Sequence, residues 1–209
     1  TPVTAPSWRG SSFQKSPLFP YNYLYIDPVT NPMKNFSSKF MDIMIGIVLV
    51  LGFQWWPDLK ESWQYIAFIF VYLSIIDYWI DTSAANKKYP PKKELDLIID
   101  VAIMFTLFLL IYSSLQTISY LLITFIFFRI FDSIWIIRRL REHGTENSNR
   151  HIFSTWLKSN AIDVIAALIL VGLSYDNFIS PLASLIIFII FRMISRVTAS
   201  VHFKKVYFA

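Results

Sequence analysis

Six long apolar blocks constrain this chain more than any other feature of its sequence. They run over residues 40–57, 62–80, 95–114, 117–137, 160–179 and 181–201. Each is close to the ~20 residues that cross the hydrocarbon core of a bilayer as a helix. Only 16% of the residues are charged and the mean hydropathy is +0.49, which leaves too little polar surface for a soluble domain. The sequence therefore predicts an all-α integral membrane protein with six transmembrane helices.

The basic residues predict the orientation of these spans. The loops on one side, "QWWPDLKES", "YSSLQ" and "SYDNFIS", contain Lys60 as their only cation. The other side is flanked by Lys34, Lys39, Lys87, Lys88, Lys92, Lys93, Arg138, Arg139, Arg141, Arg150, Lys158, Lys204 and Lys205. The positive-inside rule then places both termini on the cytoplasmic side of a prokaryotic cell membrane, or on the matrix side of the mitochondrial inner membrane. This asymmetry explains the net charge of +5 without a nucleic-acid partner.

The polar residues within the blocks suggest three helical hairpins, at about 39–90, 91–145 and 158–205. The first helix of each hairpin has an aspartate near its inner end, and the second helix carries the related patterns "YLSIIDYW", "FFRIFDSIW" and "IFRMISRV". In these patterns Ser74, Arg129 and Arg192 correspond. The pattern favours an internal three-fold repeat, and the alternative is that apolar helices resemble one another through composition alone.

Two further segments flank the spans. Residues 1–38 form an extended arm rich in proline and aromatic residues, with no helical apolar period. The segment at about 150–158 places apolar residues at helical spacing between Arg150 and Lys158, which predicts a short helix in the inner membrane interface. The alternative for this second segment is a plain connector.

Charged residues within the apolar blocks form a candidate intramembrane network. A charge at the bilayer centre costs about 2.5–3.5 kcal/mol on insertion scales, so each one needs a partner or water. At ~1.5 Å per residue, Arg129 and Arg192 lie near mid-depth, and their side chains reach the level of Asp100 and Asp163. We therefore expect Arg129 to pair with Asp100, and Arg192 with Asp163. The predicted network comprises Asp42, Asp77, Asp96, Asp100, Arg129, Asp132, Asp163, Arg192 and Arg196.

The first hairpin has a serine where the other two have arginine. Asp42 and Asp77 therefore lack a local basic partner, and Arg196 is a spare cation on the last helix. This predicts that the first and last hairpins share charges. The network has a structural interpretation, in which polar pairs fix how the helices dock. It also has a functional one, in which the pairs line an ion or proton path or sense voltage.

The region 95–141 resembles, in part, the third and fourth helices of voltage-sensor domains. Arg129, Arg138 and Arg141 fall at multiples of three residues, and Asp96 and Asp100 precede them as acidic countercharges. The segment "NAIDVIAALILVGLS" is similar to the entry of such a third helix. The resemblance implies a voltage-responsive element. A potassium pore is not expected, since no "TVGYG"-like filter occurs.

No feature of the chain predicts an enzyme. Cysteine is absent, the three histidines lack metal-ligand spacing, and no nucleotide-binding or hydrolase motif occurs. No cofactor is predicted, although bound lipids are expected.

Two functions from different classes follow from the sequence. The first is a non-catalytic accessory subunit of a larger membrane complex, because the arm cannot bury a core of its own. Its aromatic side chains suit docking onto other membrane subunits, and they are Phe13, Phe19, Tyr21, Tyr23 and Tyr25. The alternative is an ion-translocating or voltage-responsive protein that uses the arginine and aspartate network.

Overall fold

The structure, a computed structural model, describes residues 32–144, 147–175 and 178–207, with side chains at 39–144, 149–175 and 178–198. The described part is helical apart from short connections. The helices are α1 (Pro32–Phe53), α2 (Ser62–Lys88), α3 (Glu94–Ser113), α4 (Ile118–His143), α5 (Asn147–Tyr175) and α6 (Pro181–Tyr207). Six segments, one in each of these helices, are long and apolar enough to cross a membrane, as the sequence predicts.

Local side-chain chemistry sets the helix boundaries. The Gln64 side chain accepts hydrogen bonds from the backbone N–H groups of Lys60 and Glu61, which caps the start of α2. The Asp96 carboxylate accepts from the N–H groups of Lys92 and Lys93 in the same way at the start of α3. Pro181 occupies the first position of α6, where a missing N–H costs nothing.

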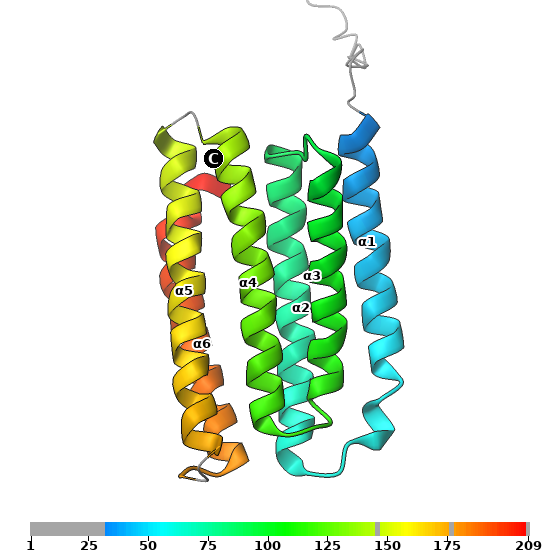
Figure 1. Cartoon of the computed structure of the whole chain (residues 1–209), viewed down its shortest axis with the longest axis vertical. Coiled ribbons are helices and arrows are strands. Elements are labelled where there is room, and N and C mark those ends of the chain that lie inside the picture. Colours follow the sequence, from blue (N-terminus) through cyan, green and yellow to red (C-terminus); the bar gives the residue numbers. More distant parts are fainter. Residues whose placement is uncertain (1–31, 145–146, 176–177, 208–209) are drawn as a thin grey trace, which may run out of the picture. The chain divides into compact units, whose positions relative to one another are not determined.

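The helices run side by side as an antiparallel bundle (Figure 1). Each helix packs against the next in sequence, with α4 and α5 making the most extensive contact. Helices α3 and α4 are central, since half of the apolar window of each is buried, whereas α1, α5 and α6 are mostly exposed. The centre of the bundle is therefore built around α3 and α4.

The two ends of the bundle differ in charge. The α2–α3 and α4–α5 connections lie at one end, toward the top of Figure 1, with Lys87, Lys88, Lys92 and Lys93 around the first of them. We call this the basic end. The connections of α1 with α2, α3 with α4 and α5 with α6 lie at the opposite end. Within the described residues, Lys60 is the only basic residue in these opposite-end connections.

Residues 150–158 are helical, but they do not form a separate interfacial helix. They belong to the first turns of α5, which continues without interruption to Tyr175. No proline or glycine interrupts this stretch before Gly172, so nothing in the sequence breaks the helix there. Phe153 is fully buried, and the centre of its ring lies 4.9 Å from that of Tyr89. This part of α5 therefore packs inside the bundle.

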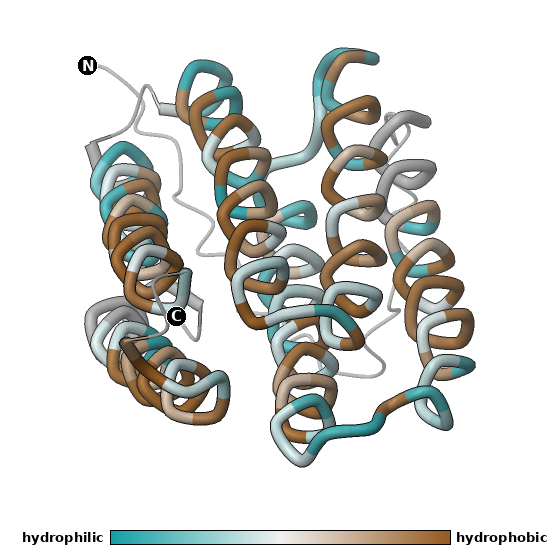
Figure 2. The backbone as a smooth tube through the Cα atoms, turned by 60° about the horizontal axis from the view of Figure 1, so that its bottom comes forward, coloured by the Kyte–Doolittle hydropathy of each residue, from teal (hydrophilic) through white to brown (hydrophobic). Residues whose placement is uncertain are grey.

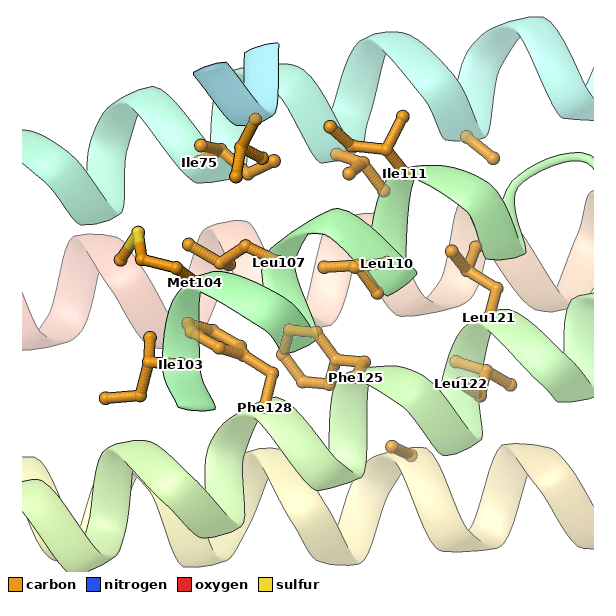
Figure 3. Packing of buried hydrophobic residues seen from close by; sticks show 14 of the residues in the cluster. Ile75, Ile103, Met104, Leu107, Leu110, Ile111, Leu121, Leu122, Phe125 and Phe128 are labelled. Carbon is orange, nitrogen blue, oxygen red and sulfur yellow. The ribbon is translucent and has the colours of Figure 1, made fainter. Parts of the chain in front are cut away.

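All six helices contribute side chains to the apolar core of the bundle, and most of them come from α2, α3 and α4. Figure 3 shows Ile75 of α2, Leu107 and Ile111 of α3, and Leu122 and Phe125 of α4 packed together. The surface is apolar as well, since large hydrophobic side chains are exposed on all six helices. Figure 2 shows hydrophobic residues recurring along the helices. The arrangement suits an apolar surrounding rather than water.

One glycine brings two helices into close contact. A Cβ atom at Gly52 in α1 would lie 2.5 Å from a side-chain methyl group of Ile111 in α3, and 3.0 Å from the hydroxyl of Tyr72 in α2. Ile111 is itself fully buried. The lack of a side chain at Gly52 therefore permits the close approach of α1 to α3.

Candidate functional site

The buried charges meet at mid-depth, where one carboxylate binds two arginines. Oδ2 of Asp163 in α5 lies 2.7 Å from Arg192 in α6 and 3.0 Å from Arg129 in α4. Asp163 is only 1% exposed. At ~1.5 Å per residue, Arg129 and Arg192 both lie about 16 Å from the first residue of their helices. This distance is about half of the ~30 Å thickness of the hydrocarbon core of a bilayer.

A second carboxylate extends this contact within α4. Asp132 lies 3.5 Å from Arg129, one helical turn away. Its Oδ2 also accepts a hydrogen bond of 2.7 Å from the side-chain amide of Asn160 in α5. The same amide nitrogen is 3.3 Å from the hydroxyl of Ser133. Asp132 is thus held by one charged and one neutral donor.

A third group of charges joins α2 to α6. Arg196 donates to Asp77 at 2.8 Å and also pairs with Asp81. These three side chains are 34–41% exposed. The side chains of Arg129, Asp132 and Asp163 are only 1–12% exposed. We refer to all of these groups as the central network. It comprises Asp77, Asp81, Arg129, Asp132, Asn160, Asp163, Arg192 and Arg196.

The central network borders a cavity of about 100 Å³. Ser74, Tyr78 and Thr82 of α2 and Ser159 of α5 add hydroxyl groups to its wall. Nε of Arg129 and Nε1 of Trp135 have no hydrogen-bond partner within the described part of the chain, but both atoms are sealed from solvent by their neighbours. A polar cavity of this volume has room for several water molecules.

Toward the opposite end, the cavity gives way to an apolar layer. Phe125 and Phe188 meet edge to face with their ring centres 4.8 Å apart, and both are nearly fully buried. Arg129 lies at the boundary, since its guanidinium is 5.0 Å from the ring centre of Phe125. We call this layer the apolar plug, and it comprises Leu107, Leu110, Leu121, Leu122, Phe125, Leu185 and Phe188. In the described residues, no buried charge lies between Arg129 and the opposite end.

A separate cluster of charges closes the basic end. Asp96 accepts a hydrogen bond of 2.6 Å from Arg138 and lies 3.6 Å from Arg139. Arg139 is 1% exposed, also pairs with Glu142, and stacks over the ring of Trp135 at 5.0 Å. Because Asp96 also caps α3, this cluster fixes the end of α4 against the start of α3.

Several predicted contacts agree with the structure. The pairing of Arg192 with Asp163 is confirmed, and so is the charge shared between the first and last hairpins, since Arg196 binds Asp77. The expected partner of Arg129 was wrong, because its ion pairs involve Asp132 and Asp163 instead of Asp100. The reason is that α4 packs more extensively against α5 than against α3.

Asp100 and Asp42, which were also predicted to belong to the network, lie outside it. Asp100 is fully buried and interacts electrostatically with Arg139, near the basic end. Asp42 is exposed on α1, where it accepts a hydrogen bond of 2.7 Å from Trp79, away from the other charges. The nine charges therefore do not form a single network. The docking residues Phe13, Phe19, Tyr21, Tyr23 and Tyr25 lie outside the described residues.

Several members of these sites were not among the predicted residues, including Asp81, Asn160, Trp135, Arg139 and Glu142. Asp81 follows Asp77 by one helical turn and Asn160 precedes Asp163 by a similar step, so helical spacing was a usable signal for both. Trp135 follows Asp132 by three residues, so the same spacing applied to it, whereas nothing in the sequence indicated that Arg139 is buried. Arg139 in particular reads as an ordinary basic residue at a helix end, and only the packing of α4 buries it.

Comparison with known proteins provides no assignment for this site. No family model matches the chain, and no curated protein or solved structure shows significant similarity to it. Within the described residues, no group of three or more histidine or carboxylate side chains is placed to hold a metal ion.

Proposed function

We propose that this chain is an integral membrane protein with six transmembrane helices and its basic end in the cytoplasm or the mitochondrial matrix. The supporting observation is that the distribution of polar and apolar side chains is the reverse of that in a soluble protein. Large apolar side chains are exposed along all six helices, whereas the ion pairs lie among the helices. Lipid favours such a surface, and water does not. On this proposal the helices act as three hairpins, with α1 and α2, α3 and α4, and α5 and α6 as partners.

We further propose that the central network serves ion translocation or a response to voltage. The observation that carries this proposal is a cavity midway along the bundle whose wall contains the ion-paired arginines and aspartates and is large enough for several water molecules. Desolvating seven ionised groups is expensive, and a purely structural role needs no cavity beside them. The cavity volume suits water or a small ion and not a larger solute.

Liposomes that contain the purified protein would test this function. An imposed membrane potential should drive proton or monovalent-cation flux, or a transient charge movement, that is absent from empty liposomes. Asp132→Asn should change this signal, because the carboxylate faces the cavity and contacts Arg129. Asp42→Asn is the matched control, since Asp42 lies outside the network. The proposal fails if no charge movement occurs under either polarity, or if both variants behave alike.

The accessory-subunit function is the second candidate. It draws on the exposed apolar faces of α1, α5 and α6, which other membrane subunits can cover. The test is purification from the native membrane in mild detergent. Stable co-purification with larger subunits supports it, especially if deletion of residues 1–31, the part of the predicted arm that precedes α1, releases the chain while its helices stay inserted. Isolation of the chain alone with full charge movement supports the ion-translocating function instead.

A further inference from the structure

The charged residues that line the cavity beside the central network differ in exposure. Among the charged residues of its wall, Asp77, Asp81 and Arg196 are 34–41% exposed, whereas Arg129 is 5% exposed. The exposed residues come from α2 and α6, so the mouth of the cavity lies between these two helices. Asp81 is about 10 Å from the last residue of α2 at ~1.5 Å per residue. The mouth is therefore in the half of the bundle that contains the basic end.

The wall of the cavity is polar enough to hold water. Carboxylate, guanidinium, hydroxyl and amide side chains from α2, α4, α5 and α6 line it, beside apolar residues of α3 and α4. A polar cavity of about 100 Å³ has room for several water molecules.

The charge of the central network specifies which ions can accompany this water. Its four carboxylates and three arginines leave one net negative charge. The two carboxylates nearest the mouth, Asp77 and Asp81, share the single cation Arg196. The excess negative charge is therefore at the entrance, where it attracts small cations and disfavours anions.

We propose that this cavity is an aqueous vestibule, which admits water and small monovalent cations from the basic end, between α2 and α6, as far as Arg129. The apolar plug closes it toward the opposite end, because no buried charge or unpartnered polar side chain among the described residues lies in that half. The proposal rests on the ion-translocating function and adds its sidedness, its entrance and the charge of the permitted ion. The membrane potential then falls mainly across the plug.

Cysteine accessibility is a direct test, because the chain contains no native cysteine. Ser74→Cys and Ser159→Cys place thiols in the cavity wall at little cost in volume. Ser114→Cys places a thiol at a fully buried position near the opposite end of α3, and Leu73→Cys places one on the adjacent exposed apolar surface of α2. The probe is Ag⁺, a small monovalent cation that reacts with thiols, added to one side of sealed vesicles in nitrate buffer. Thiols that remain are then counted with a fluorescent maleimide after denaturation.

We expect Ag⁺ at the basic end to protect Ser74→Cys and Ser159→Cys at least tenfold faster than Ag⁺ at the opposite end. The Ser114→Cys and Leu73→Cys thiols should stay unprotected from both sides, and all four thiols should react once the protein is denatured. The proposed vestibule is refuted if Ag⁺ protects the Ser74→Cys and Ser159→Cys thiols equally from both sides, or if it protects neither of them. Protection of Leu73→Cys at the same rate overturns it too, since Ag⁺ then arrives through the lipid face. The readout requires no flux, so an accessible vestibule without charge movement refutes only the proposed function.

Discussion

The shared carboxylate of Asp163 gives the most demanding prediction, because its removal leaves two arginines without their closest partner. At an effective dielectric constant of ~20, a contact of 2.7 Å corresponds to an attraction of about 6 kcal/mol before desolvation. Desolvation offsets much of this, and breaking one buried pair typically costs about 3–5 kcal/mol. Asp163→Leu should therefore lower the free energy of unfolding by about 3–5 kcal/mol.

The partner variant should have a smaller effect. Arg192→Leu leaves Asp163 in contact with Arg129, so we expect a loss of about 1–3 kcal/mol. In the double variant no arginine is left unpaired at position 192, and Arg129 retains Asp132 at 3.5 Å. The two losses should therefore not add, and the coupling should be about 2 kcal/mol.

Equilibrium unfolding in mixed detergent micelles, followed by circular dichroism, provides the four free energies. Asp42→Leu serves as the control, because its carboxylate is exposed and bonds only to Trp79 among the described residues. It should cost less than about 1 kcal/mol. Losses that add to within about 0.5 kcal/mol would refute the pairing, and the two arginines would then have to be stabilised by water in the cavity.

Three other predictions rest on neighbouring features. Arg139→Met should lower the free energy of unfolding by about 3 kcal/mol in the same assay, because it removes a buried cation from the carboxylates of Asp96 and Glu142. Arg141→Met is the control and should be nearly neutral, because Arg141 is exposed. Gly52→Ala should lower the free energy of unfolding by about 1–3 kcal/mol, because the new methyl group clashes with Ile111. Gly46→Ala is the control and should be neutral or slightly stabilising, since no atom lies within 4 Å of its new methyl group. Equal effects would argue against the close approach of α1 and α3. Reporter tags at the two termini should lie in the same compartment as the basic end, and tags on opposite sides would mean that one helix does not cross the membrane.

The sequence by itself determined the elements of this protein. Apolar blocks of membrane-spanning length define six helices, because a helix is the form in which a single segment can satisfy its backbone in lipid. Depth along each helix follows from a fixed rise per residue, so Arg192 and Asp163 could be matched from the sequence alone. The spare charge of Arg196 likewise predicted a contact with the first hairpin.

Only the tertiary structure decided which helix faces which. Depth alone places Asp100 and Asp163 at the same level, and the packing of α4 against α5 selects Asp163 as the partner of Arg129. Packing also buries Arg139, a residue that its position at a helix end marks as solvated. The cavity has the same origin. Its wall combines residues from five helices, and such a set depends on rotation and contact between helices, which one-dimensional periodicity does not encode.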